Sequence, residues 1–119
     1  MKKLILSIAA VVISTSMFAN KDVEASLCSN TNSISIKDLQ NCKELMLNNE
    51  EWKVEYFQIG FVIDGDYHEY TMESKDITDN FFKKIEKYTP TKLYIERIIV
   101  SNKQNEKKTL PNLSLNVTE

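Results

Sequence analysis

The chain has 119 residues, with 15 basic and 17 acidic side chains and a formal net charge of −2. This length allows one modest domain behind a leader, with a core that is only marginally able to stabilise itself. Because the basic residues form no stripe interleaved with aromatic ones, composition argues against a nucleic-acid partner.

The N-terminus predicts a secretory signal peptide. Lys2 and Lys3 supply a positive n-region, and residues 4–13 supply an apolar h-region that is followed by a small polar run. The uncharged stretch is shorter than the roughly 20 apolar residues that span a bilayer, so we expect cleavage and no integral membrane span afterwards. The mature protein is therefore expected to be periplasmic or secreted.

Small residues permit signal cleavage after Ala19 or after Ala25. We favour Ala25, because a bulky methionine stands at the third position before the first of these sites. The predicted organisation is thus a signal peptide over residues 1–25 and a single domain over residues 26–119, since no linker or internal repeat divides the rest of the chain.

Cys28 and Cys42 are the two cysteines of the chain, and both lie in the exported part. An even number of cysteines in an oxidising compartment predicts a disulfide, and the Cys-x-x-Cys pattern of a redox site is absent. Closing this short loop is worth roughly 3 kcal/mol in the chain-entropy model. Lipidation of Cys28 is not expected, because the large Leu27 precedes it.

The first half of the domain is predicted to contain a helix and a hairpin. Ser35 suits the N-cap of a helix over residues 36–47. Residues 52–63 alternate as a strand with two largely apolar faces, which is typical of the middle of a packed sheet or sandwich. The Asp-Gly pair at Gly65 predicts a tight hairpin turn, from which residues 67–72 return.

The second half is predicted to repeat this order. An amphipathic helix over residues 79–88 is ended by the Thr-Pro pair that follows it. Residues 93–100 change their apolar phase near Glu96 and Arg97, which indicates a β-bulge. A polar turn is predicted over residues 101–108. Apolar and polar side chains then alternate over residues 113–117, which predicts a strand with one solvent-exposed face, and the proline ahead of them suits an edge strand.

This order of elements predicts an α+β fold, mainly antiparallel β-sheet and sandwich-like, with two short helices after the signal peptide. With that order in hand, residues 39–117 resemble the C-terminal domain of GldM, a periplasmic protein of the gliding-motility and type IX secretion machinery of Bacteroidota. The resemblance lies in the order and spacing of these segments: residues 36–39, residues 54–63 with Phe57 at the centre, the Gly65 turn, Ser74 before Phe81 and Phe82, residues 93–100 and residues 108–111.

The resemblance implies a stand-alone version of a domain that contacts other cell-envelope proteins. Full-length members of that family carry a retained transmembrane helix and further periplasmic domains ahead of this one. The sequence also departs from the family at Thr89-Pro90, where glycine is usual, and over residues 102–106, where an Asp-Gly turn is usual. We therefore expect an exported, non-catalytic protein-binding module, an accessory to secretion or gliding motility, rather than a motor subunit.

Tyrosines mark the predicted interaction surface. Tyr67, His68 and Tyr70 lie on the returning strand of the hairpin, and Tyr94 lies on a later strand. Tyrosine is favoured at protein interfaces because it combines a large apolar ring with a polar tip, although it also fills ordinary sheet positions.

Two alternatives use parts of the same region. His68 lies beside Asp66 and Glu69, and this group of titratable side chains could serve a small secreted hydrolase or inhibitor. Exposed tyrosines could instead belong to a surface or adhesion component. In our main interpretation the chain has no catalytic residue, no metal ligand and no cofactor, and its partner is another cell-envelope protein.

Overall fold

The computed structural model describes residues 23–119, and the predicted signal peptide therefore lies almost wholly outside the described residues. The elements follow one another as β1 (Ala25–Leu27), β2 (Ser33–Ser35), α1 (Ile36–Gln40), β3 (Leu45–Leu47), β4 (Trp52–Ile63), β5 (Asp66–Met72), α2 (Asp79–Tyr88), β6 (Lys92–Asn102), β7 (Lys107–Leu110) and β8 (Leu113–Thr118). The fold is α+β and mainly antiparallel, with two short helices, as the sequence predicts.

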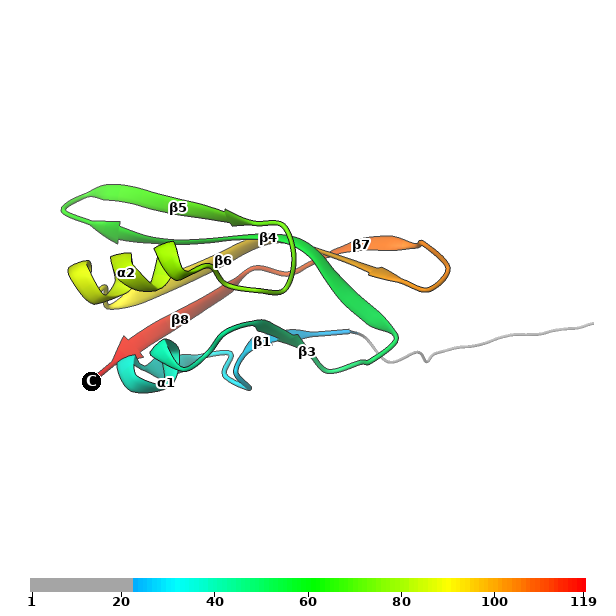
Figure 1. The fold of residues 1–119 in the computed structure, drawn as a ribbon, viewed down its shortest axis with the longest axis horizontal. Coiled ribbons are helices and arrows are strands. Elements are labelled where there is room, and N and C mark those ends of the chain that lie inside the picture. Colours follow the sequence, from blue (N-terminus) through cyan, green and yellow to red (C-terminus); the bar gives the residue numbers. More distant parts are fainter. Residues whose placement is uncertain (1–22) are drawn as a thin grey trace, which may run out of the picture.

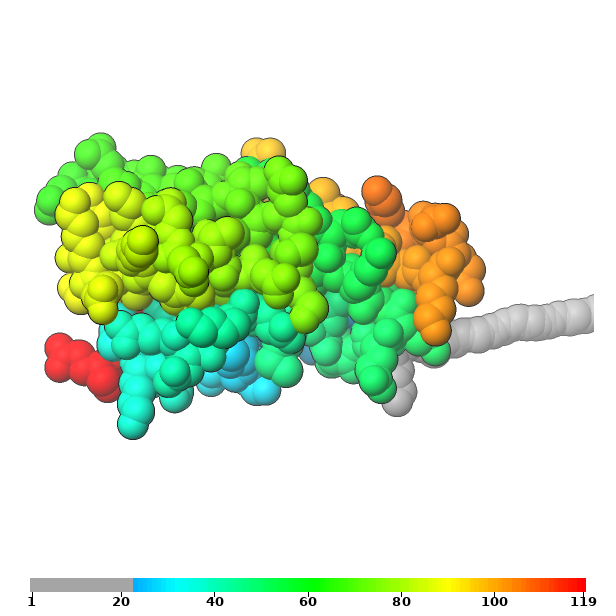
Figure 2. Space-filling view, in the orientation of Figure 1, coloured from blue at the N-terminus to red at the C-terminus, as the bar shows by residue number. Residues whose placement is uncertain are grey.

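A six-stranded sheet forms the body of the domain, with the strands in the order β2-β8-β6-β4-β5. The sixth strand of this sheet, β7, lies off this path and pairs with the second half of β6, beyond the stretch that pairs with β8. All of these pairs are antiparallel except β2 with β8. The helices and the two-stranded sheet of β1 and β3 lie on one face of the sheet (Figure 1), where α2 and α1 meet side by side (Figure 2).

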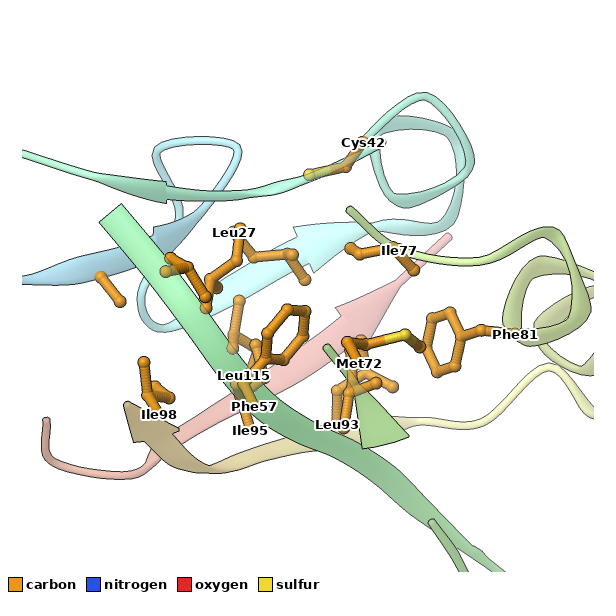
Figure 3. Packing of buried hydrophobic residues seen from close by; sticks show 14 of the residues in the cluster. Leu27, Cys42, Phe57, Met72, Ile77, Phe81, Leu93, Ile95, Ile98 and Leu115 are labelled. Carbon is orange, nitrogen blue, oxygen red and sulfur yellow. The ribbon is translucent and has the colours of Figure 1, made fainter. Parts of the chain in front are cut away.

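The core lies between this face of the sheet and its cover. Phe57, Ile59 and Phe61 project from β4 at alternate positions and are completely buried. Phe81 and Ile85 of α2 are equally buried in the same cluster, and Figure 3 shows Phe81 within it. Burying each such side chain stabilises the fold by about 1.5–3 kcal/mol, so the covered face of β4 contributes strongly to stability.

Turn chemistry sets the ends of the hairpin and of α2. Asp64 and Gly65 connect β4 to β5 with φ angles of 53° and 85°. Positive φ at both positions is what a two-residue hairpin requires. Thr89 ends α2 in the left-handed region, with a φ of 43°, and its N–H donates to the carbonyl of Ile85. Both features occur where the sequence predicts them.

Two bulges keep apolar residues on the covered face. Arg97 has a φ of 53°, and the register between β4 and β6 shifts there, as the change of apolar phase predicts. Ile98 and Val100 therefore return to the core. A second shift, at Glu55 of β4, was not predicted; it brings Val54 into the core as well, although simple alternation would place it outside.

The predicted helix over residues 36–47 is wrong in its second half. Ser35 caps α1 as expected, its hydroxyl accepting from the N–H of Asp38. The helix nevertheless ends at Gln40, because the Asn41 side chain donates to the carbonyl of Lys37 and the following chain becomes extended. Residues 45–47 then pair with β1 instead of completing the helix, since strand pairing satisfies their backbone groups.

The last strand is not at the edge of the sheet. β8 keeps the predicted alternation, but its residues 116–118 pair in parallel with β2, a strand that the sequence did not predict. The polar turn is also shorter than residues 101–108, because β6 continues to Asn102 and β7 begins at Lys107.

The N-terminal boundary of the packed domain lies ahead of residue 26. Val23 and Ala25 are only 3% and 6% exposed, and Ala25 pairs with Leu47 in the small sheet. Packing thus includes residues that cleavage after Ala25 would remove.

The Cys28–Cys42 disulfide is present, and its Cα atoms are 5.8 Å apart. It joins the turn after β1 to the segment that follows α1, which confirms the predicted pairing. None of the helices within residues 23–119 is long and apolar enough to cross a membrane.

Candidate functional site

The four residues of the predicted interaction surface do not share a face. In β5, His68 lies opposite Phe61 and Tyr70 lies opposite Ile59, both on the covered side of the sheet. Tyr67 alternates to the uncovered side, where Tyr94 also lies. The period of two in a strand therefore divides the predicted surface into two pairs.

His68 belongs to an aromatic cluster beside α2. Its ring stacks on Phe61 at 5.6 Å between centroids and lies 5.4 Å from that of Tyr88. Glu69 projects from the opposite face of the hairpin, since it lies opposite Gly60. Residues 23–119 contain no group of three or more histidine, cysteine, aspartate or glutamate side chains that could hold a metal ion. The hydrolase alternative needs His68, Asp66 and Glu69 close together, but Glu69 lies on the other face of the hairpin from His68.

Tyr70 lies in the same cluster, with its ring 5.6 Å from that of Phe81 in an edge-to-face contact. Burial raises the pKa of Tyr70, and the neighbouring Tyr88 adds to the shift. These contacts attach β5 to α2 and give Tyr70 a packing role.

Tyr67 lies across Gly60 on the uncovered face. A Cβ atom at residue 60 would stand 2.5 Å from the Tyr67 hydroxyl oxygen, so the ring occupies the space that a side chain would fill. Its ring meets that of Tyr94 edge-on, with centroids 6.3 Å apart, and its hydroxyl donates to Glu96 at 3.4 Å. Burial, followed by the negative charge of Glu96, raises the pKa of Tyr67 to about 12. With Val62, which is 48% exposed, these residues form a flat, partly apolar surface.

A groove that sequence reasoning missed lies at the other end of β4. It has a volume of about 750 Å³, within the range of ligand-binding clefts. Its three walls are β3 with its flanking residues, the first residues of β4, and the segment that leaves β5. These side chains line it: Glu44, Leu45, Met46, Leu47, Asn49, Glu50, Trp52, Lys53, Val54, Glu55, Glu73, Ser74, Lys75 and Asp76.

The groove exists because β4 is longer than its neighbour β5. Pairing with β6 begins at Trp52, whereas pairing with β5 begins only at Phe57. After Met72 the chain leaves β4, and the Lys75 carbonyl accepts from the N–H of Leu45 at 2.8 Å. Within the described part of the chain, residues 53–56 consequently have no strand on the β5 side.

Negative charge predominates in the groove. Its two lysines are both ion-paired within it, Lys75 with Glu44 and Lys53 with Glu55. The remaining carboxylates, those of Glu50, Glu73 and Asp76, form no ion pair among residues 23–119. The lining of the groove therefore contains more acidic than basic side chains.

Glu55 is held in its charged form. Ser101, which is 3% exposed, donates its hydroxyl hydrogen to the Glu55 carboxylate, and Lys53 lies 3.5 Å away. The Ser101 hydrogen bond first, and the charge of Lys53 after it, lower the pKa of Glu55 below its ordinary 4.5. Ser101 thereby holds the carboxylate of Glu55, one of the residues that line the groove.

Apolar side chains provide the rest of the lining. Met46 is 40% exposed, and Leu47 and Trp52 are half-buried. The sequence signal for this site was the apolar run of residues 45–47, which we assigned to the predicted helix over residues 36–47.

In a comparison with known proteins, neither a protein-family model nor a curated protein sequence matches the chain.

Proposed function

We propose that this chain is an exported, non-catalytic protein-binding module that acts in the periplasm or outside the cell, and that its partner is another cell-envelope protein. The observation that carries the proposal is the groove beside β4, where an apolar and acidic hollow borders a strand edge that no strand within residues 23–119 covers. Exposed strand edges are recurring sites for protein partners, because main-chain hydrogen bonds supply affinity and adjacent pockets supply specificity.

Two further observations support the compartment and the kind of partner. The Cys28–Cys42 disulfide is suited to an oxidising compartment, in agreement with the export signal in the sequence. The resemblance to the GldM C-terminal domain favours an accessory role in secretion or gliding motility.

The alternatives have less support. For a hydrolase centred on His68, Asp66 is exposed at the hairpin turn, Glu69 lies on the other face, and the imidazole packs against the rings of Phe61 and Tyr88. Adhesion through the surface of Tyr67 and Val62 predicts self-association of the purified protein, which light scattering measures directly.

Crosslinked capture of envelope proteins tests the proposal. Immobilised mature protein is mixed with envelope extract of its source cells, and two charge-introducing variants are compared. Met46→Lys alters the groove, and Val62→Lys makes the same change on the uncovered face, where the side chain is similarly exposed.

We expect wild type and Val62→Lys to capture the same protein and Met46→Lys to lose it. Equal capture by all three proteins would exclude the groove as the binding site. No capture by any of them would overturn the proposed function.

A further inference from the structure

We propose that the groove binds a basic, extended segment of the partner protein, which adds to β4 as a short strand in line with β5. This inference rests on the proposed function and specifies the chemistry of the occupant.

Strand geometry provides the first step. β5 occupies one edge of β4 from Phe57 onward, and residues 53–56 continue that edge into the groove. Four residues of strand span about 13 Å at 3.3 Å per residue, so the edge accommodates a segment of about four residues. An added strand would pair with the backbone groups of residues 53–56 that point away from β6.

The lining provides the second step. Side chains of an added strand alternate between its two faces, so every second one can reach the exposed Met46 and the half-buried Trp52. Small or branched apolar residues at those positions would bury the side chain of Met46, which is large and adaptable.

Charge provides the third step. Glu50, Glu73 and Asp76 line the groove without an ion-pair partner among the described residues, and both lysines of the groove are already paired. Lysine or arginine at the alternate positions of the segment complements these carboxylates. An acidic segment would meet like charges, which disfavours it.

The experiment uses synthetic peptides and the mature protein with its disulfide intact. The first peptide alternates lysine with valine over eight residues, the second replaces each lysine with glutamate, and the third carries N-methyl groups on alternate residues of the lysine peptide. Affinity is measured by titration calorimetry at low and high salt.

We expect the lysine peptide to bind and the other two to bind at least tenfold more weakly. Salt should weaken binding of the lysine peptide, because exposed charge pairs are screened. In the protein, Glu73→Gln and Asp76→Asn should each weaken binding by up to about fivefold, the upper value for an exposed ion pair. Val62→Lys should leave binding unchanged.

The outcomes separate this inference from the proposed function. Equal binding of the glutamate peptide would overturn the charge argument, and equal binding of the N-methylated peptide would overturn strand addition. If the lysine peptide fails to bind while Met46→Lys still abolishes capture of an envelope protein, the inference is wrong and the binding function stands. If the peptide-free protein self-associates and Met46→Lys prevents it, the occupant is a second copy of this chain, which also overturns the inference.

Discussion

Replacing Gly60 by alanine tests whether Tyr67 has a structural role on the uncovered face. The added Cβ would lie 2.5 Å from the Tyr67 hydroxyl oxygen, 2.6 Å from its Cζ and 2.7 Å from the carbonyl oxygen of His68. All three distances are well inside van der Waals contact. The ring can swing away, but the His68 carbonyl belongs to the backbone of β5 and moves only if the strand shifts.

The expected cost of Gly60→Ala is about 1–3 kcal/mol, the usual range for inserting a methyl group into a filled site. For a domain of this size, 1 kcal/mol corresponds to a fall in Tm of about 4–8 °C. Urea denaturation of wild type, Gly60→Ala, Tyr67→Ala and the double variant gives the coupling between the two positions.

Because two of the three close contacts are with Tyr67, Gly60→Ala should cost less in the Tyr67→Ala background than in the wild type. The remaining contact with His68 should keep that cost above zero. A Gly60→Ala variant as stable as the wild type, or the same loss in both backgrounds, would refute the idea that the ring fills this space.

Three further predictions follow from the covalent and polar contacts. Replacing both Cys28 and Cys42 by serine should cost about 3 kcal/mol in urea denaturation; a loss no larger than that of a surface substitution would contradict the loop-closure argument. Ser101→Ala should destabilise the protein above pH 4.5, because it removes the hydrogen bond to the charged Glu55 carboxylate. This part of the loss should vanish as pH falls through the lowered pKa of Glu55, since protonation abolishes the same charge-assisted bond in the wild type. A loss of stability that is independent of pH would count against that bond. A mature chain that begins at residue 26 should be less stable than one that begins at residue 20 by about 1.5–3 kcal/mol, because it lacks the buried Val23; equal melting temperatures would show that this packing contributes little.

Local chemistry determined much of the fold from the sequence by itself. The Asp-Gly turn, the stop of α2 before Pro90 and the bulge at Arg97 each depend on the backbone preferences of a few adjacent residues. The Cys28–Cys42 pairing follows from there being two cysteines in a segment that we predict to be exported. Such features need no knowledge of distant parts of the chain, and the structure contains all of them.

Tertiary structure decided what depends on distant partners. Residues 45–47 have an apolar pattern that suits either a helix or a strand, and pairing with β1 selected the strand. β2 could not be recognised from three polar-flanked residues, because its partner β8 lies at the other end of the chain.

The candidate site shows the same division. Sequence identified tyrosines and His68 as surface candidates, but the alternation of β5 against β4 assigned them to opposite faces. The groove arises from the unequal lengths of paired strands and from the segment after Met72, which leaves β4 to contact Leu45. The sequence determined the turns, the caps and the disulfide. Long-range pairing alone decided which strand edge stays open, because an open edge depends on whether a distant strand pairs there, and no local pattern encodes that.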